Sequence, residues 1–133
     1  MAISLSRWPW FRRWFGSRSE RAAERFLKRL GYRILFRNYS CPGGELDLVA
    51  LHGREVVFVE VRSTAGADAE RPTLSIDQQK QRKICTAAKH FVHRHRLRDV
   101  VCRFDIVISC WPADQKEPRI THFPNAFEAT GQW

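Results

Sequence analysis

The sequence of 133 residues lacks the cysteine arrangement that a disulfide-stabilised or zinc-bound domain requires. Its four cysteines include no C-x-x-C pair, and none has the Cys/His spacing of a zinc finger. Structural disulfides and a structural zinc site are therefore not expected. A reducing cytoplasm is the compartment that best fits this cysteine usage.

Long hydrophobic runs are also missing. No run approaches the roughly 20 apolar residues that cross a bilayer, so no integral membrane segment is expected. Residues 1–16 form an N-terminal extension of arginines and aromatic residues without the apolar stretch or cleavage site of a signal peptide. We expect this extension to pack on the domain's own surface or to be disordered. Contact with nucleic acid and docking on a membrane or partner are the alternatives.

Negative charge is scarce, because 14 acidic residues face 23 Lys and Arg and leave a formal charge of +9. Such a surplus favours polyanionic partners, with nucleic acid first and an anionic membrane surface second. The alternative is that the surplus consists only of solvated Lys and Arg side chains on helix surfaces. The length suits one domain with one core, which we place at residues 17–133.

Hydrophobic periodicity predicts an α/β domain. Apolar residues at helical spacing indicate helices over residues 20–30 and 75–96. Strand-like runs cover residues 32–39, 45–51, 55–62 and 100–109, with a short final strand over 119–123 as an option. This α-β-β-β-α-β order predicts a mixed central sheet flanked by helices.

The second and third strands carry acids in otherwise apolar runs, GELDLVA at 44–50 and VFVEVR at 57–62. A hairpin centred on residues 53–54 places Asp47 opposite Glu60, and Glu45 opposite Arg62. Like charges that face each other destabilise a sheet. The convergence of Asp47 and Glu60 therefore requires a cation.

Two cations can compensate these acids. Arg62 can form a salt-bridge ladder with Glu45, which would be a purely structural arrangement. The interpretation we favour is a divalent metal, Mg²⁺ or Mn²⁺, held by Asp47, Glu60 and a backbone carbonyl such as that of Val61. Such a metal would activate water and neutralise charge at a phosphodiester, which a basic surface would gather.

At these residues the sequence resembles the PD-(D/E)XK nuclease superfamily. More closely, it resembles the YraN family of small, poorly characterised bacterial proteins that are similar to archaeal Holliday-junction resolvases. The resemblance rests on ordered motifs that include GELDLVA at 44–50, FVEVR at 58–62, Lys80, RFDIV at 103–107 and NAF at 125–127. It implies a restriction-endonuclease-like core and Mg²⁺- or Mn²⁺-dependent cleavage of DNA, branched or structured DNA included. By analogy with resolvases it also suggests a homodimer.

The resemblance also implies roles for single residues. Asp47 and Glu60 match the metal-binding acids of the superfamily, and Glu20 matches a further acid near the metal. Arg62 stands where the superfamily motif has lysine. Because arginine effectively cannot lose its proton, Arg62 can stabilise negative charge but is a poor general base.

Two alternatives to a working nuclease follow. One is a catalytically weak or inactive nucleic-acid-binding module on a nuclease fold, and the other is a membrane- or partner-docking protein that uses the N-terminal extension.

Further charged residues have a structural alternative beside the functional one. Three basic residues at the start of the second helix are predicted to contact nucleic acid, with a solvated helix face as the alternative: Lys80, Arg82 and Lys83. Asp105, inside the fourth strand, is expected to be a structural acid paired with Arg103 or a neighbouring strand.

Overall fold

The computed structural model describes residues 18–65, 76–114 and 116–129, so the extension over residues 1–16 lies outside the described part. Seven elements follow one another: α1 (Arg18–Arg29), β1 (Arg33–Cys41), β2 (Gly44–His52), β3 (Glu55–Ala65), α2 (Gln78–Arg94), β4 (Val101–Trp111) and β5 (Arg119–Phe127). Within the described residues, no helix is long and apolar enough to span a membrane.

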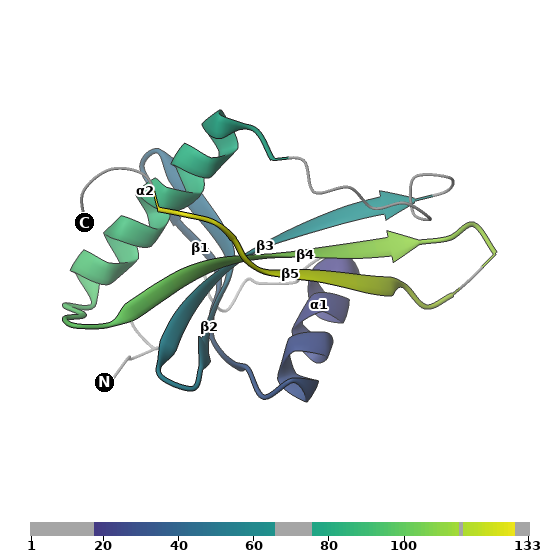
Figure 1. The fold of residues 1–133 in the computed structure, drawn as a ribbon. Coiled ribbons are helices and arrows are strands. Elements are labelled where there is room, and N and C mark those ends of the chain that lie inside the picture. The colour runs from purple at the N-terminus through teal and green to yellow at the C-terminus, as the bar shows by residue number, and fades with distance from the viewer. Residues whose placement is uncertain (1–17, 66–75, 115, 130–133) are drawn as a thin grey trace.

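The strands form one five-stranded mixed sheet in the order β1-β2-β3-β4-β5. Only β3 and β4 are parallel, because α2 carries the chain back between them. The helices α1 and α2 lie on opposite faces of this sheet (Figure 1). The predicted α/β architecture is confirmed, and it is consistent with a restriction-endonuclease-like core.

Several element boundaries differ from the predictions by a few residues, and two of the differences have a clear cause. β5 runs to Phe127 rather than to residue 123, although Pro124 lies inside it. As an edge strand it tolerates proline, and a register shift opposite Phe104 and Ile106 absorbs the irregularity. The helix predicted over 75–96 begins only at Gln78, because the Asp77 side chain caps its first turn.

β3 is buried on both faces, which explains its almost continuous apolar sequence. Val56 and Phe58 pack with Phe91 of α2 in one core cluster. Val57 and Val59 pack with α1 in the second cluster. The alternation therefore assigns Glu60, two residues after Phe58, to the α2 side of the sheet.

The β1-β2 hairpin turns over halfway along its length. Leu48 packs on the α1 side, but Leu46 joins Val49 on the α2 side. Strict alternation would place Leu46 and Leu48 on one face, but it fails at the residue between them, Asp47. Opposite that position the β1 residue Asn38 has a φ of 51°, a left-handed conformation, and Phe36 and Tyr39 on either side of it both pack on the α2 side.

The far end of this hairpin rests on α2. A Cβ on Gly44 would lie 2.2 Å from the Lys83 carbonyl oxygen, so only glycine allows this approach. The Tyr39 hydroxyl also contacts His90 of α2. The end of β2 that carries Glu45 is thereby held beside the beginning of α2.

Asp105 is fully buried on the α1 side, where its carboxylate makes five hydrogen bonds. The donors and partners are Tyr32, Arg103 through two nitrogens, His122 and the backbone N–H of Asn125. Although burial alone raises the pKa of Asp105, these partners lower it to about 2. The expected pairing with Arg103 is confirmed.

Asp105→Asn should therefore destabilise the fold by about 3–5 kcal/mol at pH 7, because it leaves Arg103 without its buried counter-charge. The lowered pKa of Asp105 means that its contribution is present above the unfolded pKa and is lost as the pH falls toward 2. Urea unfolding from pH 7 to pH 2.5 should show the difference between variant and parent shrinking with acid. Asp114→Asn, at an exposed turn, is the control. Equal stability of parent and Asp105→Asn at pH 7 would contradict this account.

Candidate active site

The candidate site lies where β2 separates from β3. Their ladder runs from His52–Glu55 to Leu48–Val59 and ends there, while β3 continues beside β4 to Ala65. Two residues beyond the last pair, the Val61 N–H donates to Asp47 Oδ2 at 2.7 Å instead of to a β2 carbonyl. The sheet therefore forks, and a carboxylate occupies the point of separation.

The predicted hairpin register is confirmed, since the pairing of Leu48 with Val59 makes Asp47 and Glu60 the next opposed residues. The predicted partnership of Glu45 with Arg62 in the ladder is wrong. The strands have already separated at that point, and the ion-pair contact of Glu45 is with Lys80 of α2, at 3.9 Å.

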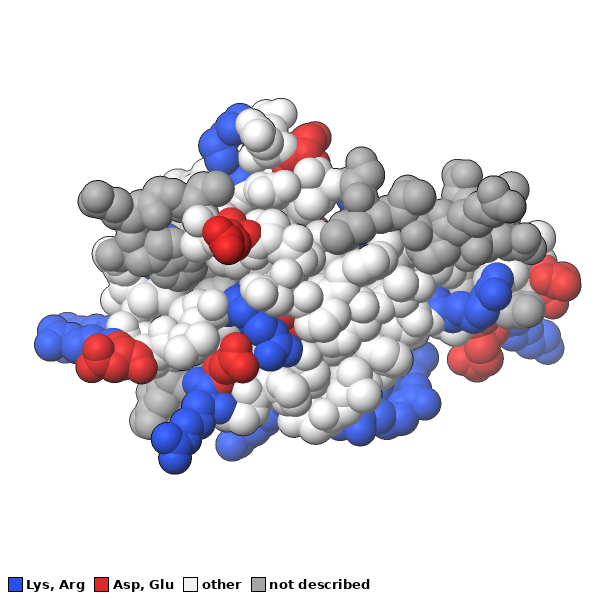
Figure 2. Space-filling view, in the orientation of Figure 1, with Lys and Arg blue, Asp and Glu red and all other residues white. Residues whose placement is uncertain are grey.

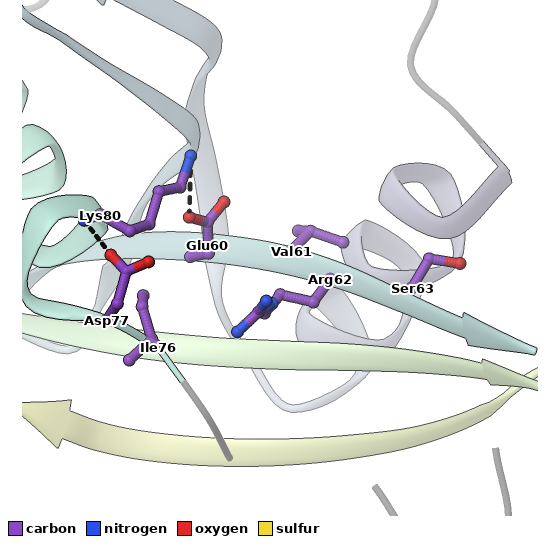
Figure 3. Close-up of a pocket in the computed structure, with 7 residues that line it drawn as sticks. All are labelled: Glu60, Val61, Arg62, Ser63, Ile76, Asp77 and Lys80. Atoms are coloured by element: carbon purple, nitrogen blue, oxygen red, sulfur yellow. Dashed lines mark hydrogen bonds and ion pairs between the residues drawn. The ribbon is translucent and has the colours of Figure 1, made fainter. Parts of the chain in front are cut away.

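A cavity of about 470 Å³ lies at this fork. Its lining comes from the end of β3 and the start of α2: Glu60, Val61, Arg62, Ser63, Ile76, Asp77 and Lys80 (Figure 3). Both carboxylate and ammonium groups face this space. The fork thus joins acids from the sheet with a basic residue from the first turn of α2.

Glu60 and Lys80 point toward each other across the cavity (Figure 3), and Lys80 Nζ lies 3.3 Å from Glu60 Oε2. The same Glu60 oxygen is buried and has no hydrogen-bond partner among the described residues. The backbone of Lys80 is fixed by the helix cap, because its N–H donates to the Asp77 side chain at 2.7 Å. Among the described residues, the negative charge on this buried Glu60 oxygen is therefore balanced only by one contact with Lys80 at ion-pair distance.

Asp47 is the most perturbed acid of the site. Burial raises its pKa well above the ordinary value, and the neighbouring Glu60 carboxyl raises it further. The Val61 N–H and the positive charge of Lys80 act in the opposite direction without cancelling these effects. The acid pair is thus short of positive charge, which is the condition that favours binding of an additional cation.

Arg62 does not supply that charge. Its side chain is exposed, and in Figure 3 it extends away from the Glu60 carboxylate, toward Ile76 and Asp77. The sequence interpretation missed Lys80 as the cation beside Glu60. A usable signal existed, because Asp77 is a favourable N-cap three residues earlier and fixes where the helix presents Lys80.

The donor set fits a hard divalent cation that keeps several waters. Asp47 and Glu60 offer carboxylate oxygens. The Val61 carbonyl faces the side that β2 has left, because N–H and C=O of one strand residue point to the same neighbour. The described residues contain no cluster of three or more His, Cys, Asp or Glu side chains, so water must complete any coordination.

The structure does not bring every predicted residue to the acid pair. Glu20 is half-buried in the first turn of α1, where it forms contacts of its own, and its role as a further ligand stays a prediction. Arg82 and Lys83 lie exposed on α2 close to Lys80. Their contact with nucleic acid also stays a prediction.

Comparisons with known proteins agree on one family. Residues 19–108 match the model of the uncharacterised protein family UPF0102. A UPF0102 protein of Geobacter metallireducens is 40% identical over 85% of this chain and 91% of its own length. One of Geobacter sulfurreducens is 44% identical over 85% and 88%, and one of Rhodopirellula baltica is 38% identical over 87% and 71%.

Asp47→Asn should stabilise the metal-free protein. The amide oxygen can still accept from Val61, while the change removes a buried charge that Glu60 disfavours. Thermal unfolding in EDTA at pH 8 should therefore give a higher Tm for the variant than for the parent. Addition of Mn²⁺ should raise the Tm of the parent and leave the variant unchanged, since the variant has lost a ligand.

The control for this measurement is Asp114→Asn, which keeps the acid pair intact. It should respond to EDTA and Mn²⁺ as the parent does. An Mn²⁺ shift of the same size in Asp47→Asn would exclude Asp47 as a ligand.

Proposed function

The chain belongs to the uncharacterised protein family UPF0102, and we propose from its site that it is a nucleic-acid-binding, metal-dependent nuclease-like protein that cleaves DNA phosphodiester bonds. The observation that carries the proposal is the under-compensated pair of the half-buried Asp47 and the buried Glu60 at the sheet fork. A structural ion pair would be better satisfied. The net charge of +9 supports a polyanionic substrate.

In this proposal Asp47, Glu60 and the Val61 carbonyl hold one Mg²⁺ or Mn²⁺. When bound, such an ion supplies a water of lowered pKa and neutralises charge on the scissile phosphate. The chain's own residues position the substrate. The exposed Arg62 and the first turn of α2 line the cavity and would contact phosphate oxygens.

Lys80 and Arg62 differ in what they can contribute. Both line the cavity, but lysine can exchange a proton at accessible pH and arginine effectively cannot. We therefore assign charge stabilisation to Arg62. Lys80 occupies the cation position in the metal-free protein, and its flexible stem allows the ammonium to move from Glu60 to a phosphate once a metal binds.

Cleavage should depend on both acids. With branched, single-stranded and duplex DNA in Mg²⁺ or Mn²⁺, Asp47→Asn and Glu60→Gln should lower the rate by about 10²-fold or more, because each removes a charge that holds the metal. Gel assays of product formation measure this. Asp114→Asn, an exposed acid outside the cavity, is the matched control and should cleave like the parent. Equal rates in all four proteins would reject the proposal.

The alternative is a nucleic-acid-binding module with weak or no catalysis. The position of Arg62 supports this alternative. Its guanidinium is exposed and does not lie beside the Glu60 carboxylate (Figure 3). If a proton-exchanging group is required at this position, Arg62→Lys should cleave while the parent is inert, and both should bind DNA equally. Parallel cleavage and anisotropy measurements decide this. Efficient cleavage by the parent would exclude the alternative.

A further inference from the structure

A second hollow, of about 230 Å³, lies beside α1. Three exposed arginines border it at helical spacing: Arg18, Arg21 and Arg25. Trp111, Lys116, Glu117 and Pro118 complete the lining from the end of β4 and the segment before β5. We call these seven residues the α1 groove. Four cations and a single carboxylate give it a strongly positive balance.

Part of the α1 groove is held in place by the fold. The Trp111 indole N–H donates to Ser19 Oγ at 2.8 Å, which fixes the ring. The Arg18 guanidinium lies over that ring, 4.1 Å from its centre, in a cation–π contact. This guanidinium is therefore positioned before any ligand arrives, which lowers the entropy cost of binding.

Hydrogen bonds connect the α1 groove to the candidate active site. Ser63 lines the active-site cavity, and Ser19 Oγ donates to its hydroxyl at 2.9 Å. Ser19 in turn accepts from Trp111 of the α1 groove. The end of β3 also pairs with the end of β4, Ala65 beside Trp111. Ser19 thus links Ser63 of the cavity to Trp111 of the α1 groove at one end of the sheet.

The arrangement fits a linear polyanion. Along α1, the span from Arg18 to Arg25 is about 10 Å at ~1.5 Å per residue. One strand of duplex DNA presents a phosphate about every 3.4 Å along its axis, so about three phosphates fit this span. In Figure 2, Lys and Arg side chains gather along the lower edge of the molecule, the side on which α1 lies in Figure 1.

We infer that the α1 groove is a second phosphate-binding surface, which holds the backbone of the nucleic acid that flanks the bond at Asp47 and Glu60. This inference rests on the proposed function for its ligand. It gives a role in phosphate binding to Arg18, Arg21 and Arg25, which do not line the cavity at Glu60. It also explains why exposed basic residues lie on α1 and not only on α2, the helix that carries Lys80.

The test is the salt dependence of DNA binding, measured by fluorescence anisotropy in EDTA so that cleavage plays no part. Arg18→Ala/Arg21→Ala/Arg25→Ala should lower the slope of log K against log salt by about 2–3, at ~0.9 per lost phosphate contact. The control triple removes the same charge from exposed arginines elsewhere: Arg33→Ala/Arg54→Ala/Arg98→Ala. It should change the slope by less than one unit.

Because Arg18 also stacks on Trp111, the double variant Arg21→Ala/Arg25→Ala is the second probe, with thermal unfolding as the fold check. It should lower the slope by about 2. If the parent cleaves DNA but the α1 and control triples have equal slopes, the inference fails and the proposed function stands. If the slope falls as expected but no protein cleaves, the α1 groove stands and the nuclease proposal fails. Loss of binding to anionic vesicles without loss of DNA binding would overturn the inference.

Discussion

The structure around the site depends on one unfavourable contact, two carboxylates brought together at the edge of a buried sheet. Asp47 and Glu60 would face each other directly if the ladder between β2 and β3 continued. Like charges so placed destabilise a sheet. The chain instead separates the strands, satisfies Asp47 with the Val61 N–H, and brings Lys80 to Glu60. The cavity is the space that this separation creates.

The separation is imposed by packing at a distance from the acids. β1 and β2 turn over together at Asn38 and Asp47, so that Leu46 moves to the α2 side. The far end of the hairpin then rests against the α2 backbone, at a contact too close for any residue but Gly44. This docking on α2 holds β2 away from β3, which is the direction that repulsion between the two acids also favours. The fork therefore combines a backbone irregularity with one glycine contact.

Much of this could be predicted from the sequence because the signals are local. Hairpin register follows from the short Gly53-Arg54 turn, and the two-face burial of β3 follows from its apolar run. The fork could not be predicted, because strand alternation assumes a regular ladder and assigned Glu45 to Arg62. The contact between Lys80 and Glu60 joins residues from separate elements, and only the docked position of α2 determines it. The start of α2 shifted because a single side chain, that of Asp77, sets the boundary.

A comparison of two acid sites among the described residues strengthens the functional argument. Asp105 is fully buried, yet five hydrogen bonds compensate it and its pKa falls. In the described part of the chain, the same fold leaves Glu60 Oε2 without a hydrogen bond and lets the pKa of Asp47 rise. A chain with 23 Lys and Arg residues has cations to spare, so a shortage of positive charge is not forced on it by composition. Among the described residues, the deficit falls on the acid pair whose Glu60 lines an open cavity, where a cation from solution can enter. A deficit at that place is what a metal site predicts and what a structural ion-pair network does not.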